Sequence, residues 1–390
     1  MAGSHTALVL GGGGARAAYQ AGVLQYVARH FPNAGFPIMT GVSAGAINVS
    51  HLASREGAWN AKAAGELTEL WREVRTENIF RVESSFFLKN VAQWGMRLIS
   101  GGRGSSLSTR GLVDTSPLRG FLRDNLHTVG GVLRGIEKNV AEGDLRAAAL
   151  MTTNYSNGRS VTWVQGETLA NWERPYRTSR HTALGVDHVM ASASLPLFFP
   201  AVQIRHAWYG DGGIRQIAPL SPAIHLGARR IVTVSTRYEP TQEEAEHDII
   251  RGYPSPAHIG GVLMGSIFLD TLHRDVENLE RINRLLDRVP GREMDGMRPI
   301  DLLVLRPSRD LAALSTQYEP ELPNLFRYLL RGLGTQDTES PEWLSMLMFH
   351  PDYIRRLLRL GEEDAAERHD EIAEFFSPET RKASGWWSNQ

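Results

Sequence analysis

A serine enclosed by glycines stands near the start of the chain, in the run Gly41-Val42-Ser43-Ala44-Gly45. A short apolar run at 37–40 precedes it and a helical pattern at 44–54 follows, the strand–turn–helix context of a nucleophile elbow. Such a turn would expose the serine Oγ at the carboxyl edge of a sheet, beside a helix N-terminus whose partial positive charge favours an anion. We therefore predict that Ser43 is a nucleophile. The alternative is a tight turn with an incidental serine.

Four successive glycines, Gly11, Gly12, Gly13 and Gly14, follow the first apolar run and precede Arg16. Without side chains, their N–H groups can converge on an anion. One such anion is the oxyanion of an acyl-transfer intermediate. Another is a dinucleotide pyrophosphate, which would expect an acidic residue about 20 positions further on. No Asp or Glu occurs before position 56, so the oxyanion is favoured. A plain glycine-rich turn is the remaining alternative.

A carboxylate flanked by glycines, Asp211-Gly212-Gly213, is the candidate base. Asp-Gly pairs alone usually mark turns, but a proposed serine nucleophile needs a proton acceptor. The competing arrangement is a Ser–His–Asp triad that uses His51 or His206. We expect both imidazoles to be surface groups or to be hydrogen-bonded locally.

Composition excludes several classes of site. The 390 residues contain no Cys, which rules out disulfides, thiolate-ligated zinc and a cysteine nucleophile. The 13 His form no His-x-His or His-Glu-x-x-His pair, so we predict no metal and no cofactor. A net charge of −1 argues against a nucleic-acid partner. We find neither a secretory signal nor a spanning segment of about 20 apolar residues. We therefore expect a cytoplasmic protein and leave peripheral membrane contact open.

The elements that must position these residues begin with two strand–helix units in the first 54 residues, which predicts a parallel sheet. Apolar runs predict further strands at 145–153, 160–165, 231–235 and 301–305, and helical spacing predicts a helix over 267–286. Beyond about residue 310 we expect only helices, at 322–333, 342–349, 353–360 and 362–376. Two apolar segments, 257–269 and 343–360, have compositions suited to a lipid surface. The alternative for both segments is packing on the protein core.

Together these motifs resemble the patatin-like phospholipase family. The resemblance rests on the glycine loop with Arg16, on Gly41–Asn48 (GVSAGAIN) and on Asp211-Gly212-Gly213, in that order. Three further segments support it: AYQAGVLQ, ASASLPLFFP and APLSPAIHLGARRI. Ala17 stands where the family's motif usually has glycine.

The resemblance implies a patatin-like three-layer α/β fold, with a mostly parallel sheet between helices. The catalytic domain would span residues 6–310, and 311–390 would be a C-terminal helical extension. It implies a serine lipid acyl hydrolase (phospholipase A, lysophospholipase or carboxylesterase) that acts on a lipid or ester substrate. Ser43 would be the nucleophile and Asp211 the base of a dyad without histidine. The oxyanion hole would be Gly11–Gly14, with the motifs completed by Arg16, Gly41, Gly45, Gly212 and Gly213.

Two alternatives from other classes stay open. One is a lipid-binding or regulatory protein with a degenerate site. The other is a nucleotide-dependent oxidoreductase that uses the glycine loop. The sequence makes no prediction of oligomeric state.

Overall fold

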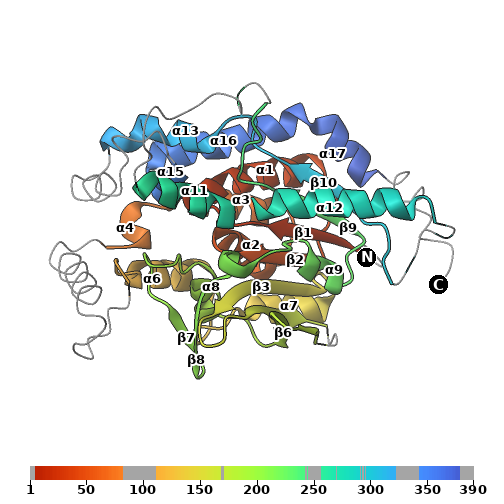
Figure 1. The fold of residues 1–390 in the computed structure, drawn as a ribbon, viewed down its shortest axis with the longest axis horizontal. Helices are drawn as coiled ribbons and strands as arrows, with labels where there is room; N and C mark the ends of the chain where they lie inside the picture. Colours follow the sequence, from red (N-terminus) through yellow and green to blue (C-terminus); the bar gives the residue numbers. More distant parts are fainter. Residues whose placement is uncertain are drawn as a thin grey trace.

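A computed structural model describes residues 5–81, 111–167, 171–241, 256–268, 270–289, 296–321 and 342–377, with single residues at 244, 291 and 294. The predicted helix at 322–333 lies outside these ranges. Within them the chain forms one ten-stranded sheet between layers of helices (Figure 1). Eight strands follow the spatial order β10-β9-β1-β2-β3-β4-β6-β5, and off this path β8 pairs with β3 and β7 pairs with β8. The predicted three-layer α/β fold is therefore confirmed.

The centre of the sheet is parallel. Strands β1, β2, β9 and β10 run in the same direction as β3, while β4 and β8 pair antiparallel to β3. The strand bounds are β1 Thr6–Leu10, β2 Ile38–Val42, β3 Ala147–Asn154, β4 Ser160–Gly166, β5 Glu173–Arg174, β6 Arg177–His181, β7 Val202–Ile204, β8 Ala207–Asp211, β9 Arg230–Val234 and β10 Asp301–Leu305. The four strands expected from apolar runs after residue 140 are all present, with ends shifted by a residue or two.

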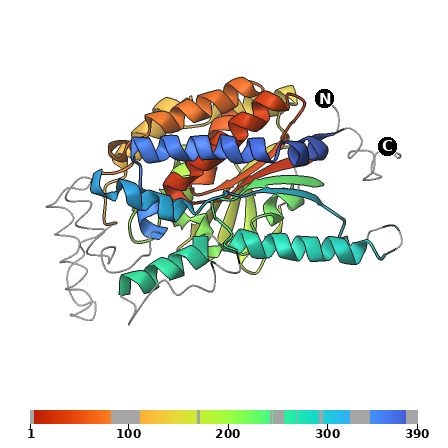
Figure 2. The ribbon, with the colours of Figure 1, turned by 90° about the horizontal axis from the view of Figure 1, so that it is seen from above.

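Helices cover both faces of the sheet (Figure 2). Side chains alternate along a strand, so Leu8 and Leu10 face one apolar cluster and Ala7 and Val9 face the other. The helix bounds are α1 Ala17–His30, α2 Ala44–Ser54, α3 Ala61–Glu73, α4 Thr76–Ile79, α6 Ser116–Asn125, α7 Arg134–Glu142, α8 Val186–Ser192, α9 Ser221–His225, α11 Pro256–Phe268, α12 Thr271–Leu286, α13 Leu311–Ser315, α15 Glu342–Leu347, α16 Pro351–Glu367 and α17 His369–Phe376. Helices α1, α2, α3 and α16 join the first cluster, and α9 and α12 join the second.

The C-terminal helices pack directly on the start of the chain. Gly22 on α1 and Gly361 on α16 let the two backbones approach so closely that a side chain at either position would collide. The Tyr19 hydroxyl donates to Asp364 Oδ2 at 2.9 Å across the same contact. The division of the chain at residue 310 stays a prediction, since these helices share the hydrophobic core of the sheet.

The structure corrects one expectation. The expected helix 267–286 is interrupted, because α11 ends at Phe268 and α12 begins after Asp270. For 343–360 the sequence left a lipid surface and packing on the protein core open, and the structure favours the core. The large apolar side chains of this segment are buried against the rest of the protein; they include Leu344, Met346, Met348, Phe349 and Tyr353. In the described part of the chain, no helix is both long and apolar enough to cross a membrane.

Candidate active site

Ser43 occupies the turn between β2 and α2, with φ 56° and ψ −130°. A positive φ is strained for a residue with a side chain and persists only where the surroundings enforce it. Here the Ser43 N–H donates to Ser192 Oγ at 3.0 Å, and the Ser192 hydroxyl donates to the Met151 carbonyl at 2.7 Å. Gly45 packs against the carbonyls of Leu10 and Gly11, so its lack of a side chain lets the turn sit tightly on β1. The predicted elbow geometry is present.

Asp211 reaches the same edge of the sheet from the end of β8. Strand β3 bridges the two residues, since it pairs Met151 with Val42 on one side and Thr152 with Asp211 on the other. The Asp211 side chain is fully buried, and its Oδ1 accepts a hydrogen bond from the Gly213 N–H at 2.8 Å. Among the described residues, its Oδ2 has no hydrogen-bond partner.

Burial raises the pKa of the Asp211 carboxyl to about 7, because a charged carboxylate is poorly solvated there. The Ser43 hydroxyl and the Gly213 N–H act in the opposite direction and lower this pKa. Ser43 is therefore near enough to stabilise the carboxylate, although the free Oδ2 shows that a complete hydrogen bond is not formed. Such bonds are often loose without substrate and tighten in the complex.

The glycine loop lies directly against Ser43, with Gly12 as the point of contact. The Gly12 carbonyl accepts a hydrogen bond from Thr236 Oγ1 at 2.8 Å, and Gln20 Nε2 donates to the Gly11 carbonyl at 3.1 Å. These bonds satisfy the carbonyls of Gly11 and Gly12. Within the described residues, the N–H groups of Gly12 and Gly13 make no hydrogen bond, so they are available to an incoming oxyanion.

Arg16 points its guanidinium at helix α15. It is almost fully buried, and its Nε and Nη2 donate to Ser345 Oγ at 2.8 and 2.6 Å. It also forms an ion pair with Glu342. Gly14 packs against the Met346 carbonyl of the same helix. Helix α15, from the C-terminal part of the chain, thus stabilises the glycine loop through its contacts with Gly14 and Arg16.

The histidines of the competing triad lie elsewhere. His51 is buried on α2 beside Arg55, and burial together with Arg55 and His127 lowers its pKa to about 3. His206 is exposed in the turn between β7 and β8. Among the described residues, no imidazole hydrogen-bonds to Ser43 or Asp211.

Sequence reasoning missed the residues that support the site, namely Ser192, Thr236, Glu342 and Ser345. Ser192 belongs to the quoted segment ASASLPLFFP, so a signal for it was present. The other three stand in segments with no motif.

The predicted glycines of the motifs lie at close contacts. Gly41 packs on the Gly45 carbonyl, Gly212 packs on the Met151 carbonyl, and Gly213 lies against Phe268 of α11.

An apolar helix lies beside the site. Phe268, in the last turn of α11, contacts Gly213, next to Asp211. Further along the helix, Ile259, Val262 and Leu263 are exposed by 42%, 53% and 57%. Helix α11 carries no Asp, Glu, Lys or Arg.

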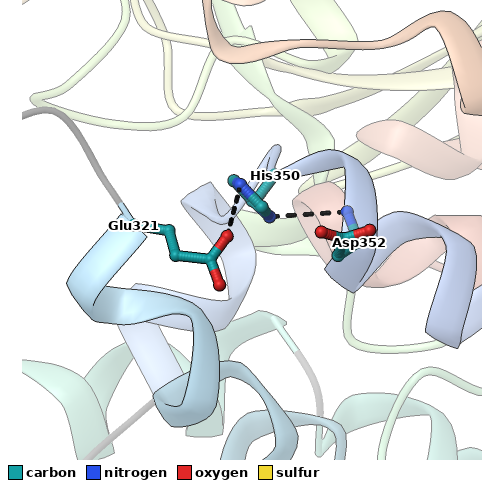
Figure 3. Close-up of side chains that lie close together, drawn as sticks. All are labelled: Glu321, His350 and Asp352. Carbon is teal, nitrogen blue, oxygen red and sulfur yellow. Dashed lines mark hydrogen bonds and ion pairs between the residues drawn. The ribbon is translucent and has the colours of Figure 1, made fainter.

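One group of side chains has the composition of a metal site, but its donor atoms are already engaged. His350 Nε2 lies 3.1 Å from Glu321 Oε2, and its Nδ1 accepts a bond from the Asp352 backbone N–H at 3.4 Å (Figure 3). The Asp352 carboxylate pairs with Arg355. His350 is the N-cap residue of α16. Capping and ion pairing therefore account for this group of side chains.

The chain is similar to solved structures and to one protein family. VipD from Legionella pneumophila aligns with a TM-score of 0.37 and 12% identity, covering 95% of this chain and 67% of VipD. The complex of SpcU with ExoU, from the type III secretion system of Pseudomonas aeruginosa, aligns with a TM-score of 0.23 and 18% identity, covering 40% of this chain and 34% of that chain. No curated protein matches the sequence. The sequence profile of the patatin-like phospholipases matches residues 8–224, a span that includes the glycine loop, Ser43 and Asp211. The chain belongs to the patatin-like phospholipase family, whose membership implies lipid acyl hydrolase activity.

Proposed function

We propose that the protein is a serine lipid acyl hydrolase that works through a Ser43–Asp211 dyad. Ser43 Oγ attacks the ester carbonyl while Asp211 Oδ2 takes the hydroxyl proton. The N–H groups of the glycine loop stabilise the oxyanion, each donor contributing roughly 3 kcal/mol. When the intermediate collapses, Asp211 returns the proton to the leaving alcohol and the acyl group stays on Ser43. Water then attacks the acyl-enzyme while Asp211 accepts its proton. When the second intermediate collapses, the bond from the acyl carbon to Ser43 Oγ breaks, Asp211 returns the proton to Oγ, and the fatty acid leaves.

The observation that carries this proposal is the environment of the Asp211 carboxyl. Its fully buried carboxyl has a pKa raised to about 7 and one oxygen that finds no hydrogen-bond partner in the described ranges, beside a serine in a strained turn. A general base works best when its pKa lies near the working pH. A carboxyl kept only for structure would be expected to have both oxygens hydrogen-bonded. The environment of Asp211 therefore favours proton transfer over a purely structural role.

A fluorophosphonate probe tests the nucleophile. The probe should label the wild-type protein, and Ser43→Ala should abolish both labelling and ester hydrolysis while leaving the fold intact. Ser50→Ala is the matched control, since Ser50 is a buried serine of α2 that no hydrogen bond engages among the described residues. Labelling that survives in Ser43→Ala contradicts the assignment. A folded wild type that neither reacts with the probe nor hydrolyses any ester would favour the lipid-binding alternative with a degenerate site.

We further propose that the enzyme meets its substrate at a lipid surface through α11. The support is the exposed apolar face of this helix, which carries no charged residue. The last residue of the helix, Phe268, contacts Gly213 beside the candidate base. Exposed apolar patches of this kind are typical of interaction surfaces. An ester drawn from the surface would enter beside Phe268.

A further inference from the structure

A cavity opens at the same edge of the sheet, two strands away from Ser43. Its volume is about 300 Å³, at the lower end of the range for ligand sites. Its walls come from the loop after β9, the start of α12 and the end of β10. In α/β sheets, ligands bind outside the carboxyl ends of the strands, and this cavity has that position.

Positive charge predominates in its walls. Arg237, Arg274 and Arg306 line the cavity together with only two carboxylates, Glu239 and Asp270. Three positive charges less two negative charges leave a net +1. Arg237 pairs with Asp270, and Arg306 Nε lies 3.1 Å from Glu239. Among the described residues, Arg274 makes no ion pair.

Several donors in these walls have no acceptor among the residues that the structure describes. The Nη groups of Arg306 and the guanidinium of Arg274 make no side-chain hydrogen bond within the described part of the chain. His273 also lines the cavity, and its two ring nitrogens face Glu239 and Glu277 at 3.6 and 3.3 Å. The arginines therefore present unused, fork-shaped donors, the geometry that matches phosphate oxygens.

The helix beside these arginines adds to the positive potential. Helix α12 has 16 residues, and its first turn lines the cavity through Leu272, His273 and Arg274. Asp270 precedes this turn, but its side chain pairs with Arg237 and caps no N–H of the helix. Helix N-termini attract anions, and phosphate groups in particular.

We propose that this cavity is a phosphate-binding subsite and that it holds the phosphate of a phospholipid head group while the ester lies at Ser43. The second half of the proposal rests on the proposed function. The segment after β9 links the two sites, since Thr236 bonds to Gly12 and the next residue, Arg237, lines the cavity. Two strand spacings separate β9 from β2, about 10 Å, a distance on the scale of a glycerophosphate unit. Helix α11 also touches both sites, through Phe268 at Gly213 and through Gly265 near Arg237.

Binding is tested first, without catalysis. Ser43→Ala protein is titrated with sn-glycerol 3-phosphate, inorganic phosphate and acetate by calorimetry. We expect both phosphates to bind and acetate to bind more weakly, because it offers fewer oxygens to the arginines. Adding Arg274→Gln and Arg306→Gln should weaken phosphate binding by about tenfold or more, since charge-assisted bonds are lost. Arg281→Gln, on an exposed site of the same helix outside the cavity, is the matched control. Equal phosphate binding with and without the two arginines overturns the proposal.

Kinetics then distinguish a lipid head group from a free phosphate compound. The ratio of kcat/KM for a short-chain phosphatidylcholine to that for the diacylglycerol of the same chains should fall about tenfold in the double arginine variant. A ratio that does not move, with phosphate binding still dependent on the arginines, contradicts the head-group role and assigns the cavity to a free phosphate compound. If the wild type hydrolyses neither ester, the proposed function fails, while the titration still decides whether the cavity binds phosphate.

Discussion

Gly12 and Ser43 stand so close that a methyl group on Gly12 would lie 2.9 Å from Ser43 Cβ and 3.5 Å from Ser43 Oγ. The backbone of the glycine loop therefore occupies the space directly beside the proposed nucleophile. An ester carbonyl held by Ser43 would have its oxygen near the Gly12 and Gly13 N–H groups, which are the donors that an oxyanion needs.

Gly12→Ala should lower kcat by about a hundredfold or more, because the added methyl displaces either Ser43 or the loop and misplaces the reacting atoms. The fold should survive, since the clash is with one small side chain. Esterase rates and circular dichroism of the same preparation check both statements. Gly65→Ala is the control, because Gly65 lies inside α3 with open space around it. That change should leave the rate unaltered and favour the helix by about 1 kcal/mol.

The rate of ester hydrolysis should depend on a single ionisation. With the Asp211 pKa at about 7, kcat/KM should rise about tenfold per pH unit below that value and level off above it, as expected for a base that must be deprotonated. A soluble ester assayed between about pH 5 and pH 9 measures this profile. His206→Ala should give the same profile. A profile that collapses in His206→Ala or His51→Ala, with the fold intact, would replace the dyad by a triad.

Asp211→Asn should abolish activity and at the same time stabilise the protein at alkaline pH. The carboxyl pKa is 3.8 for an ordinary Asp and about 7 in the fold, so the folded state binds this proton more tightly than the unfolded state. Wild-type stability therefore falls as pH rises from about 4 to about 7, by an amount on the order of 4 kcal/mol at most. Asparagine is always neutral and keeps the oxygen that accepts from Gly213.

Thermal unfolding measures this effect as a difference in Tm between Asp211→Asn and wild type. The difference should be larger at about pH 8 than at about pH 5. Asp124→Asn, at an exposed position of α6, should show the same small difference at both pH values. An Asp211→Asn variant that loses stability equally at both would show that the carboxylate is a structural group.

The sequence predicted the parts of the site that local order determines. A strand, a glycine-bounded serine and a helix are contiguous, so the elbow at Ser43 could be read without knowing the rest of the fold. The same holds for the glycine loop after β1. The family and the three-layer α/β fold followed from the order of these motifs. Strands β5 to β8 were not predicted, because they are short and lack an apolar run; β6, for example, reads RTSRH.

What the sequence did not predict depends on contacts between distant segments. Ser192 holds the Ser43 backbone from 149 positions away, and Ser345 holds Arg16 from 329 positions away. Ser192 stands in the segment ASASLPLFFP, but that segment does not indicate Ser43 as its partner, and Ser345 stands in no motif. The two alternatives for 343–360, a lipid surface and the protein core, stayed open for the same reason, since an apolar face does not reveal what covers it.

Ser345→Ala should loosen the glycine loop. Two N–H groups of the buried Arg16 would lose their acceptor, which costs about 1.5–3 kcal/mol of folding stability. We expect kcat to fall more than KM changes, because the loop acts on the oxyanion and not on the ground state. Ser345→Thr keeps the oxygen and should restore most activity. Ser315→Ala is the control, as within the described part of the chain its hydroxyl bonds only to its own helix, at the Ala312 carbonyl. Equal losses in Ser315→Ala and Ser345→Ala would refute a specific link from α15 to the loop.

The exposed face of α11 should decide whether the enzyme reaches membrane-borne esters. Val262→Asp with Leu263→Asp replaces two apolar side chains that would enter the lipid by two charges. Burial contributes about 1.5–3 kcal/mol for each such side chain, so the partition coefficient on vesicles should fall about a hundredfold or more. Sedimentation with phosphatidylcholine–phosphatidylglycerol vesicles measures it. Leu285→Asp is the matched control, because Leu285 is exposed by 52%, close to the 53% of Val262, but lies on α12. The α11 variant should still hydrolyse a soluble ester, which separates loss of docking from loss of chemistry. If wild type and variant sediment equally, α11 does not dock on lipid, and its apolar face covers some other surface.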